Sequence, residues 1–178
     1  MALGKLYLLV EGDDDERLVN IFKPILLRRY NSVILWKYAQ EKKSKIKSFV
    51  RSIIALKDDF IFLGDINNTP CVTEKKNDIV RKYSSIINNK KIVVVIKEIE
   101  SWYLAGLSDE IAKKIVKHTF KTTNTITKEQ FDNLIPKKYQ SRIDFMMEIL
   151  KFFSFDISKR KNDSFNYFAN NFLEISHC

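Results

Sequence analysis

Apolar and polar positions along the first hundred residues alternate between two spacings. Four short, continuous apolar runs are separated by segments whose apolar residues recur at helical spacing. The runs predict strands at Lys5–Val10, Val33–Tyr38, Phe60–Gly64 and Ile92–Ile96. The intervening segments predict helices at Asp14–Arg28, at Lys45–Leu56 and around Ile79–Ile87. This alternation predicts an α/β fold of Rossmann-like type, with a mainly parallel four-stranded sheet flanked by helices.

After Glu100 the pattern becomes helical throughout. We expect helices at Trp102–Leu107, Asp109–Lys117, 127–136, Tyr139–Phe153 and Ser164–Ile175, with a polar loop at Thr119–Thr127. Ser108 and Thr127 are typical helix caps. The bulky residues Trp102 and Tyr103 are expected in the core. We interpret residues 1–178 as one domain, in which 1–100 form the core and 101–178 form a helical extension packed on it.

Acidic residues follow three of the four predicted strands. They are Glu11 with the run 13–16, Asp65 with the amide Asn67, and the pair Glu98 and Glu100. The carboxyl ends of parallel strands meet at one edge of a sheet, where α/β folds bind their ligands. Carboxylates crowded at that edge repel one another unless they share a cation, and Mg²⁺ prefers oxygen ligands. The sequence therefore predicts a Mg²⁺ (or Mn²⁺) site at this edge.

Each acidic position also has a structural explanation. Acids in the first turn of a helix offset the macrodipole, which accounts for part of the run that includes Asp15. Asp65 and Asn67 could shape a loop by bonding its backbone. Glu11 precedes the turn, so neither explanation covers it. Asn67 could supply an amide oxygen to the metal, and Glu98 or Glu100 could be a ligand or a general base.

The charge balance points toward a polyanionic partner. Lys and Arg number 31 against 22 Asp and Glu, a net charge of +9, and cationic surfaces favour nucleic acid because binding releases counterions. Lysine-rich surfaces also arise without such a partner. The residues expected to contact nucleic acid are Lys97, Lys137, Lys138, Arg142, Lys159, Arg160 and Lys161.

The acidic motifs resemble the Toprim superfamily, the metal-binding α/β domain of topoisomerases, bacterial-type primases, OLD-family nucleases and small nucleases that mature ribosomal RNA. The match consists of the segment 10–12, in which Glu11 closes a strand, and of 65–67, where Asn67 replaces the second acid of the family's Asp-x-Asp. The segments 11–17, 98–105 and 164–168 are similar to small Toprim-like proteins related to the OLD branch.

This resemblance covers nearly the whole chain and implies Mg²⁺-dependent phosphodiester chemistry. It implies that Glu11 is a metal ligand or general acid/base and that Asp65 is a metal ligand. Asp15 and Glu100 would be further acidic contributors. With a neutral residue at position 67, metal binding should be weaker, and the site could hold one metal rather than two or could lack catalysis.

Three functions follow as hypotheses. The first is a metal-dependent nuclease or phosphodiester-transfer enzyme acting on DNA or RNA, with Glu11, Asp65 and Glu100 as its catalytic residues. The second is a catalytically weak module that binds nucleic acid or a partner protein, in a defence system for example. The third is a phosphoacceptor receiver domain, but Glu11 and the pair Glu98 and Glu100 are unexpected in such a domain.

Other features of the sequence bear on its location rather than its chemistry. No apolar stretch is long enough to span a bilayer, and the first residues lead directly into a strand without a secretory signal. Cys71 and Cys178 are expected to be free thiols, which fits a reducing cytoplasm. His118 and His177 have no partner at metal-ligand spacing.

Overall fold

The computed structural model describes residues 3–173, and the chain falls into two compact units that divide between Val94 and Val95. The first unit contains the sheet and the second is helical. The prediction that 1–178 form one domain stays a prediction, and each unit is described by itself.

The sheet of the first unit has four parallel strands in the order β2-β1-β3-β4. They are β1 (Leu3–Val10), β2 (Tyr30–Lys37), β3 (Asp59–Asp65) and β4 (Ile92–Val95). This confirms the predicted α/β class. β1 pairs with β2 on one side and with β3 on the other. The chain therefore reverses its direction across the sheet between these two neighbours, and such a switch point at the carboxyl edge is where open α/β sheets bind ligands.

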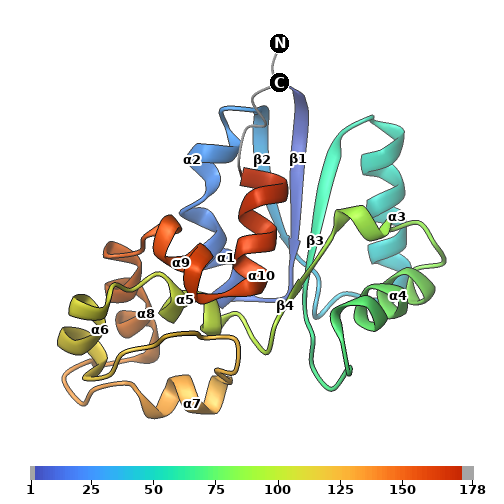
Figure 1. Ribbon diagram of the computed structural model, residues 1–178. Coiled ribbons are helices and arrows are strands. Elements are labelled where there is room, and N and C mark those ends of the chain that lie inside the picture. The colour runs from blue at the N-terminus through green and yellow to red at the C-terminus, as the bar shows by residue number, and fades with distance from the viewer. Residues whose placement is uncertain (1–2, 174–178) are drawn as a thin grey trace. The chain divides into compact units, whose positions relative to one another are not determined.

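Helices cover both faces of this sheet. They are α1 (Asp13–Asn20), α2 (Lys23–Leu26), α3 (Lys43–Ala55) and α4 (Val72–Lys82), and a short 3₁₀ turn η1 (Asn89–Lys91) precedes β4. Figure 1 shows α1 and α2 on one face, and α3 and α4 on the other. On the second face Val50 and Ile53 of α3 and Ile79 of α4 join the apolar side chains of the strands in one buried cluster, which includes Leu9 and Phe62.

The prediction of one continuous helix at Asp14–Arg28 was wrong. The segment is divided into α1 and α2 by a break at residues 21–22. Pro24 lies in the first turn of α2. Because proline has no backbone N–H, it cannot donate to the carbonyl of residue 20 and cannot continue α1.

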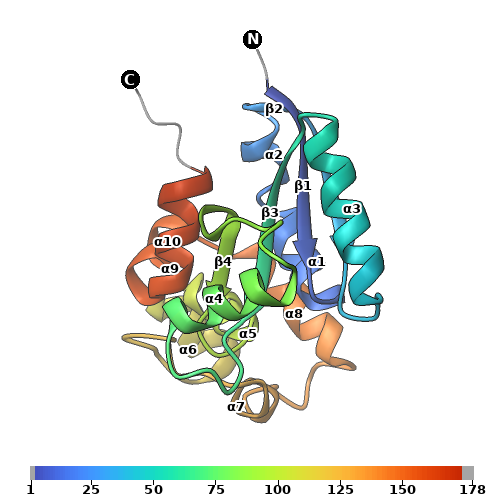
Figure 2. The ribbon, with the colours of Figure 1, turned by 90° about the vertical axis from the view of Figure 1, so that its right-hand side faces the viewer.

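The second unit consists of short helices. They are α5 (Glu100–Ala105), α6 (Asp109–Val116), α7 (Lys128–Asn133), α8 (Arg142–Lys151), α9 (Phe155–Lys161), α10 (Asp163–Phe168) and a π-helical turn η2 (Ala169–Leu173). Ser108 and Thr127 cap α6 and α7 through their side-chain oxygens, as predicted. α9 was not predicted, and it lies beside α10 (Figure 2). The predicted last helix ran to Ile175, and its final two residues lie outside the described part of the chain.

Trp102 anchors the core of the second unit. Its ring is fully buried, stacks on Phe168 at 5.4 Å between centroids and meets Phe165 edge-on at 5.2 Å. Its indole N–H donates to Ser164 Oγ at 2.8 Å. Trp102 and Tyr103 are both buried, which confirms their predicted place in the core.

A buried amide fixes the junction of α9 and α10. Asn162 Nδ2 donates to Ser101 Oγ at 3.2 Å and to Thr123 Oγ1 at 3.1 Å. Its Oδ1 accepts from Ser164 Oγ at 2.8 Å and from the Phe165 N–H at 3.0 Å. A satisfied buried polar network of this kind specifies one packing arrangement.

Candidate metal site at the carboxyl edge of the sheet

Glu11 and Asp65 meet at the switch point between β1 and β3. Glu11 directly follows β1, and Asp65 is the last residue of β3. Glu11 Oε1 accepts a hydrogen bond of 3.2 Å from the backbone N–H of Asp65. Two of the residues predicted to bind metal are therefore in contact, through the Glu11 carboxylate and the Asp65 backbone, although 54 positions separate them.

Tyr38 is the residue of this site that the sequence analysis missed as a functional candidate. It follows β2 directly and is buried. Its hydroxyl lies 2.6 Å from the backbone oxygen of Leu63 and 3.2 Å from Glu11 Oε1. Burial, and then the charges of Glu11 and Asp15, raise the pKa of Tyr38 well above its ordinary value. The hydroxyl therefore remains protonated and acts as a donor.

Gly64 leaves the space that this contact needs. A Cβ atom at Gly64 would lie 3.2 Å from Tyr38 Oη and 3.7 Å from Glu11 Oε1. The first distance is tighter than an ordinary van der Waals contact. A residue without a side chain therefore lets the tyrosine hydroxyl approach β3 closely. One signal in the sequence could have indicated Tyr38: it is the last residue of the predicted strand Val33–Tyr38, so it is expected at the carboxyl edge of the sheet, as Glu11 is.

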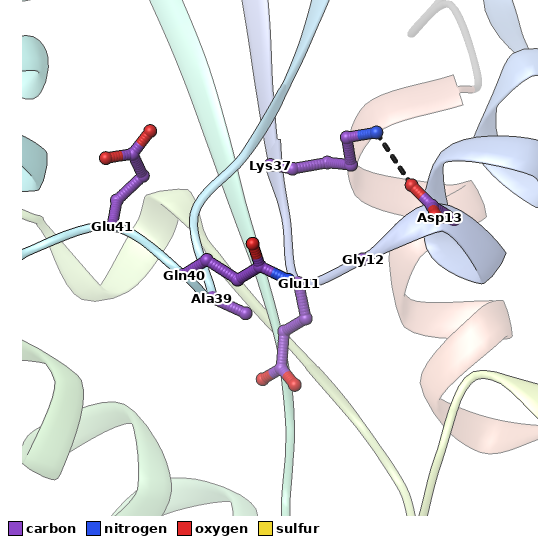
Figure 3. Close-up of a pocket in the computed structure, with 7 residues that line it drawn as sticks. All are labelled: Glu11, Gly12, Asp13, Lys37, Ala39, Gln40 and Glu41. Atoms are coloured by element: carbon purple, nitrogen blue, oxygen red, sulfur yellow. Dashed lines mark hydrogen bonds and ion pairs between the residues drawn. The ribbon is translucent and has the colours of Figure 1, made fainter.

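A hollow of about 510 Å³ opens beside Glu11. It is lined by Glu11, Gly12, Asp13, Lys37, Ala39, Gln40 and Glu41 (Figure 3). Lys37 forms ion pairs with Asp13 at 2.6 Å and with Glu16 at 3.1 Å. The Glu11 carboxylate points away from the pair of Lys37 and Asp13 in Figure 3. Within residues 3–173, no lysine or arginine forms an ion pair with Glu11, so an added cation could neutralise its charge.

The remaining acids of the first helical turn have structural partners. Asp15 is buried, and its Oδ2 accepts from the Gly12 N–H at 3.1 Å, which caps the start of α1. Asp14 forms an ion pair with Arg17 at 2.6 Å. These contacts give Asp15 a role at the helix start, while its role as a metal ligand stays a prediction.

Asn67 shapes the loop that follows β3. Its backbone is left-handed, with φ of 51°, a conformation that asparagine tolerates better than most residues. Its Nδ2 donates to the backbone oxygen of Asp65 at 3.2 Å. The geometry thus accounts for an asparagine at this position without a metal, and its role as a ligand stays a prediction.

Glu98 and Glu100 belong to the second unit and contact other residues of that unit. Glu100 is buried at the start of α5 and forms an ion pair with Arg142, which also binds Asp132 at 2.7 Å. Burial raises the pKa of Glu100, and Arg142 offsets this only in part. The carboxylate of Glu98 accepts from the Lys128 N–H at the start of α7. A metal shared by this pair with Glu11 and Asp65 stays a prediction.

The basic residues nominated for nucleic acid differ in what surrounds them. Arg142 is held by carboxylates, and Lys161 binds Asp109 at 2.7 Å and the Leu107 carbonyl at 2.9 Å. The side chains of Lys97, Lys137, Lys138 and Arg160 are exposed, while Lys159 is half-buried. Their contact with nucleic acid stays a prediction.

The donor set at the switch point suits a hard cation. Among the described residues 3–173, no three side chains of His, Cys, Asp or Glu converge on one point. Mg²⁺ is commonly held by one or two carboxylates, with waters and substrate phosphates completing its octahedron. Glu11 and Asp65, at the carboxyl ends of adjacent strands, bear ligands of this type, and their binding of a metal stays a prediction.

Comparison with known proteins gives only distant likenesses. No family model and no curated protein matches the chain. The C-terminal region of the Xanthomonas campestris OLD protein aligns over 96% of this chain and 85% of its own, at 13% identity and a TM-score of 0.41. That of the Burkholderia pseudomallei OLD protein aligns over 97% and 96%, at 11% identity and a TM-score of 0.40. Similarity at this level establishes neither fold nor function.

Two further expectations concern surface and location. Cys71 is an exposed free thiol at the start of α4, as predicted, whereas Cys178 and His177 lie outside the described residues. His118 is exposed and meets the ring of Phe120 edge-on. Within residues 3–173, no helix has both the length and the apolarity required to span a bilayer.

Proposed function

We propose that this protein cleaves phosphodiester bonds of nucleic acid with the help of Mg²⁺ or Mn²⁺. The observation that supports it best is the contact of Glu11 with Asp65 at the β1–β3 switch point. The Glu11 carboxylate accepts there from the backbone of Asp65 and borders an open hollow, and within the described residues Glu11 has no cationic partner. The net charge of +9 favours a polyanionic substrate.

In this proposal Glu11 and Asp65 hold the metal, and Tyr38 fixes the orientation of Glu11. A bound metal would polarise the scissile phosphate and lower the pKa of the attacking water. Glu11 is already positioned by the Tyr38 hydroxyl and the Asp65 N–H. Preorganisation of this kind reduces the reorganisation needed when the substrate binds.

Cleavage assays with isosteric variants test the proposal. Purified protein is incubated with labelled single- and double-stranded DNA and RNA in Mg²⁺, Mn²⁺ or EDTA. Glu11→Gln and Asp65→Asn should each reduce metal-dependent cleavage by about 100-fold or more, because each removes a charged ligand. Asp78→Asn is the matched control, since this exposed acid of α4 pairs only with Arg81 within the described residues.

Two results would contradict the enzyme. One is no cleavage of any substrate, and the other is cleavage that both site variants retain. Binding without cleavage would instead favour the module hypothesis, which gains support from the loop-shaping contact of Asn67. A covalent adduct on Asp65 after treatment with a small phosphodonor would favour the receiver hypothesis.

A further inference from the structure

A second hollow, of about 540 Å³, lies within the helical unit between the ends of α6 and α7. Four lysines line it: Lys114 and Lys117 at the end of α6, and Lys137 and Lys138 in the segment after α7. No carboxylate is part of its lining. Residues from two separate segments thus place four positive charges around one concave surface.

These four charges are not neutralised within the part of the chain that the structure describes. None of the four ammonium groups forms an ion pair there, whereas Lys37, Lys91 and Lys161 each pair with an aspartate. The C-terminal end of a helix attracts cations, which accounts for Lys114 in the last turn of α6. It does not account for Lys137 and Lys138, which follow α7. Like charges gathered without a counterion are stabilised when an anion binds among them.

Lys117 adds a backbone observation. It ends α6 in the left-handed conformation, with φ of 56° and ψ of 26°. Glycine adopts this conformation more readily than any other residue and is the commonest choice at such a helix end. A lysine at this position costs stability but adds a charge to the rim of the hollow.

The remainder of the lining is mainly apolar. Ile115 and Val116 of α6 are buried, and Leu134, Ile135 and Pro136 after α7 contribute partly exposed surface. Phosphate groups alone gain nothing from such a surface. A nucleotide has both parts, because its phosphates are anionic and the faces of its base are apolar.

We infer that this lysine-rimmed hollow binds a single-stranded segment of nucleic acid, with phosphates at the rim and a base against the apolar floor. A single strand fits better than a duplex because stacked, paired bases have no face to offer the floor. The inference rests on the nucleic-acid substrate of the proposed function and adds the form of that substrate and its binding site. It also assigns Lys114 and Lys117 to binding.

Fluorescence anisotropy in EDTA tests the inference without any need for catalysis. A labelled oligothymidylate is titrated with the protein and with K137A/K138A and K114A/K117A. Each pair should weaken binding about tenfold at low salt. The slope of log K against log salt should become shallower by about 1.4, at roughly 0.7 per lost phosphate contact on a single strand. The matched control is K113A/K121A, which removes two exposed lysines of the same unit from outside the hollow.

Two further probes separate charge from structure and from the apolar floor. Lys117→Gly should weaken binding about threefold while the melting temperature stays equal or rises, because glycine relieves the backbone. An abasic strand with the same phosphates should bind about tenfold more weakly than oligothymidylate, since base contacts each contribute substantially.

Three results would overturn the inference: pocket variants that bind like the control, a duplex that binds more tightly than the single strand, or an abasic strand that binds equally well. A different result would contradict the proposed function while leaving this inference intact. In that case single-strand binding would depend on the pocket while no substrate is cleaved in Mg²⁺ or Mn²⁺.

Discussion

Glu11 owes its position to two donors from other parts of the sheet. The Tyr38 hydroxyl and the Asp65 N–H both reach its Oε1, each at 3.2 Å. Gly64 supports this arrangement because a side chain there would crowd the tyrosine hydroxyl. At the scale of single residues, the candidate site is therefore a carboxylate whose position is fixed by two neutral donors.

Tyr38→Phe should weaken both the fold and the site. The variant removes the hydroxyl that donates to Leu63 and Glu11, so we expect a loss of about 1 kcal/mol in unfolding free energy. We also expect kcat for cleavage to fall about tenfold with little change in KM, because Glu11 loses its orientation. Urea denaturation and steady-state kinetics measure the two effects.

Tyr7→Phe is the control for this change. Tyr7 is half-buried and packs edge-on against Phe49 in the same unit. Its loss of a hydroxyl should alter neither quantity appreciably. Equal effects of the two substitutions would refute a positioning role for Tyr38.

Substitutions at Asn67 test whether its backbone conformation explains the residue. Asn67→Ala should destabilise the protein by about 1 kcal/mol, because alanine is strained at a φ of 51°. Asn67→Gly should be close to neutral, since glycine adopts this conformation freely. Thermal denaturation of the pair decides the matter, and an alanine variant as stable as the glycine variant would contradict the interpretation.

Among the elements, β3 carries different chemistry at its two ends. Its carboxyl end provides Asp65 to the candidate site, while its first residue, Asp59, accepts hydrogen bonds from Tyr30 at 2.8 Å and from Lys91. Burial alone would raise the pKa of Asp59, but the bonds from Lys91 and Tyr30 outweigh it and lower that pKa below its usual value. The hydrogen bonds of Asp59 thus link the start of β3 to β2 and to η1.

The lowered pKa of Asp59 predicts that the free energy of unfolding depends on pH. Because the pKa of Asp59 is lower in the folded state, its contribution is present above the unfolded pKa near 3.8 and is lost as pH falls through the folded value. Asp59→Asn should therefore be less stable than the natural protein by about 1 kcal/mol near pH 6. This difference should shrink below about pH 4.

Chemical denaturation of both proteins between pH 3 and pH 7 measures this difference. Asp78→Asn, at an exposed ion pair in the same unit, should show a much smaller difference throughout. If the difference in stability between Asp59→Asn and the natural protein persisted unchanged at low pH, the stabilising role of the ionised Asp59 would be contradicted.

At the scale of the whole molecule, the positions of the charged residues indicate more about binding than the net charge does. The net charge of +9 coexists with a carboxylate site on the first unit and a lysine-rimmed hollow on the second. We propose that the first binds a cation and the second binds phosphates. A protein that binds a metal and a polyanion requires both kinds of surface.

Metal binding should appear as a change in global stability. Mn²⁺ at ten times its dissociation constant should stabilise the folded protein by about 1.4 kcal/mol, which corresponds to roughly 3 to 6 °C in melting temperature. Glu11→Gln should abolish this shift, and Asp78→Asn should retain it. Differential scanning calorimetry in Mn²⁺ and in EDTA provides the measurement, and an equal shift in all three proteins would place the metal elsewhere.

The sequence by itself determined the α/β class, the four strands and the positions of Glu11 and Asp65 at strand ends. It could do so because strand and helix periodicity, and the residues that follow a strand, are local properties. Its errors were also local in origin. The periodicity of residues 14–28 concealed the break before Pro24, and the basic end of α9, residues 159–161, obscured its helical pattern.

Only the tertiary structure decided which residues touch. It brought Tyr38, which follows β2, to Glu11, placed β1 next to β3, paired Glu100 with Arg142, and gathered four lysines from two segments around one hollow. None of these contacts has a signature in local spacing, because each depends on how strands order within the sheet and on how helices pack. The physical reason is that periodicity fixes the face on which a side chain lies, whereas its partner is selected by packing between elements distant in the chain.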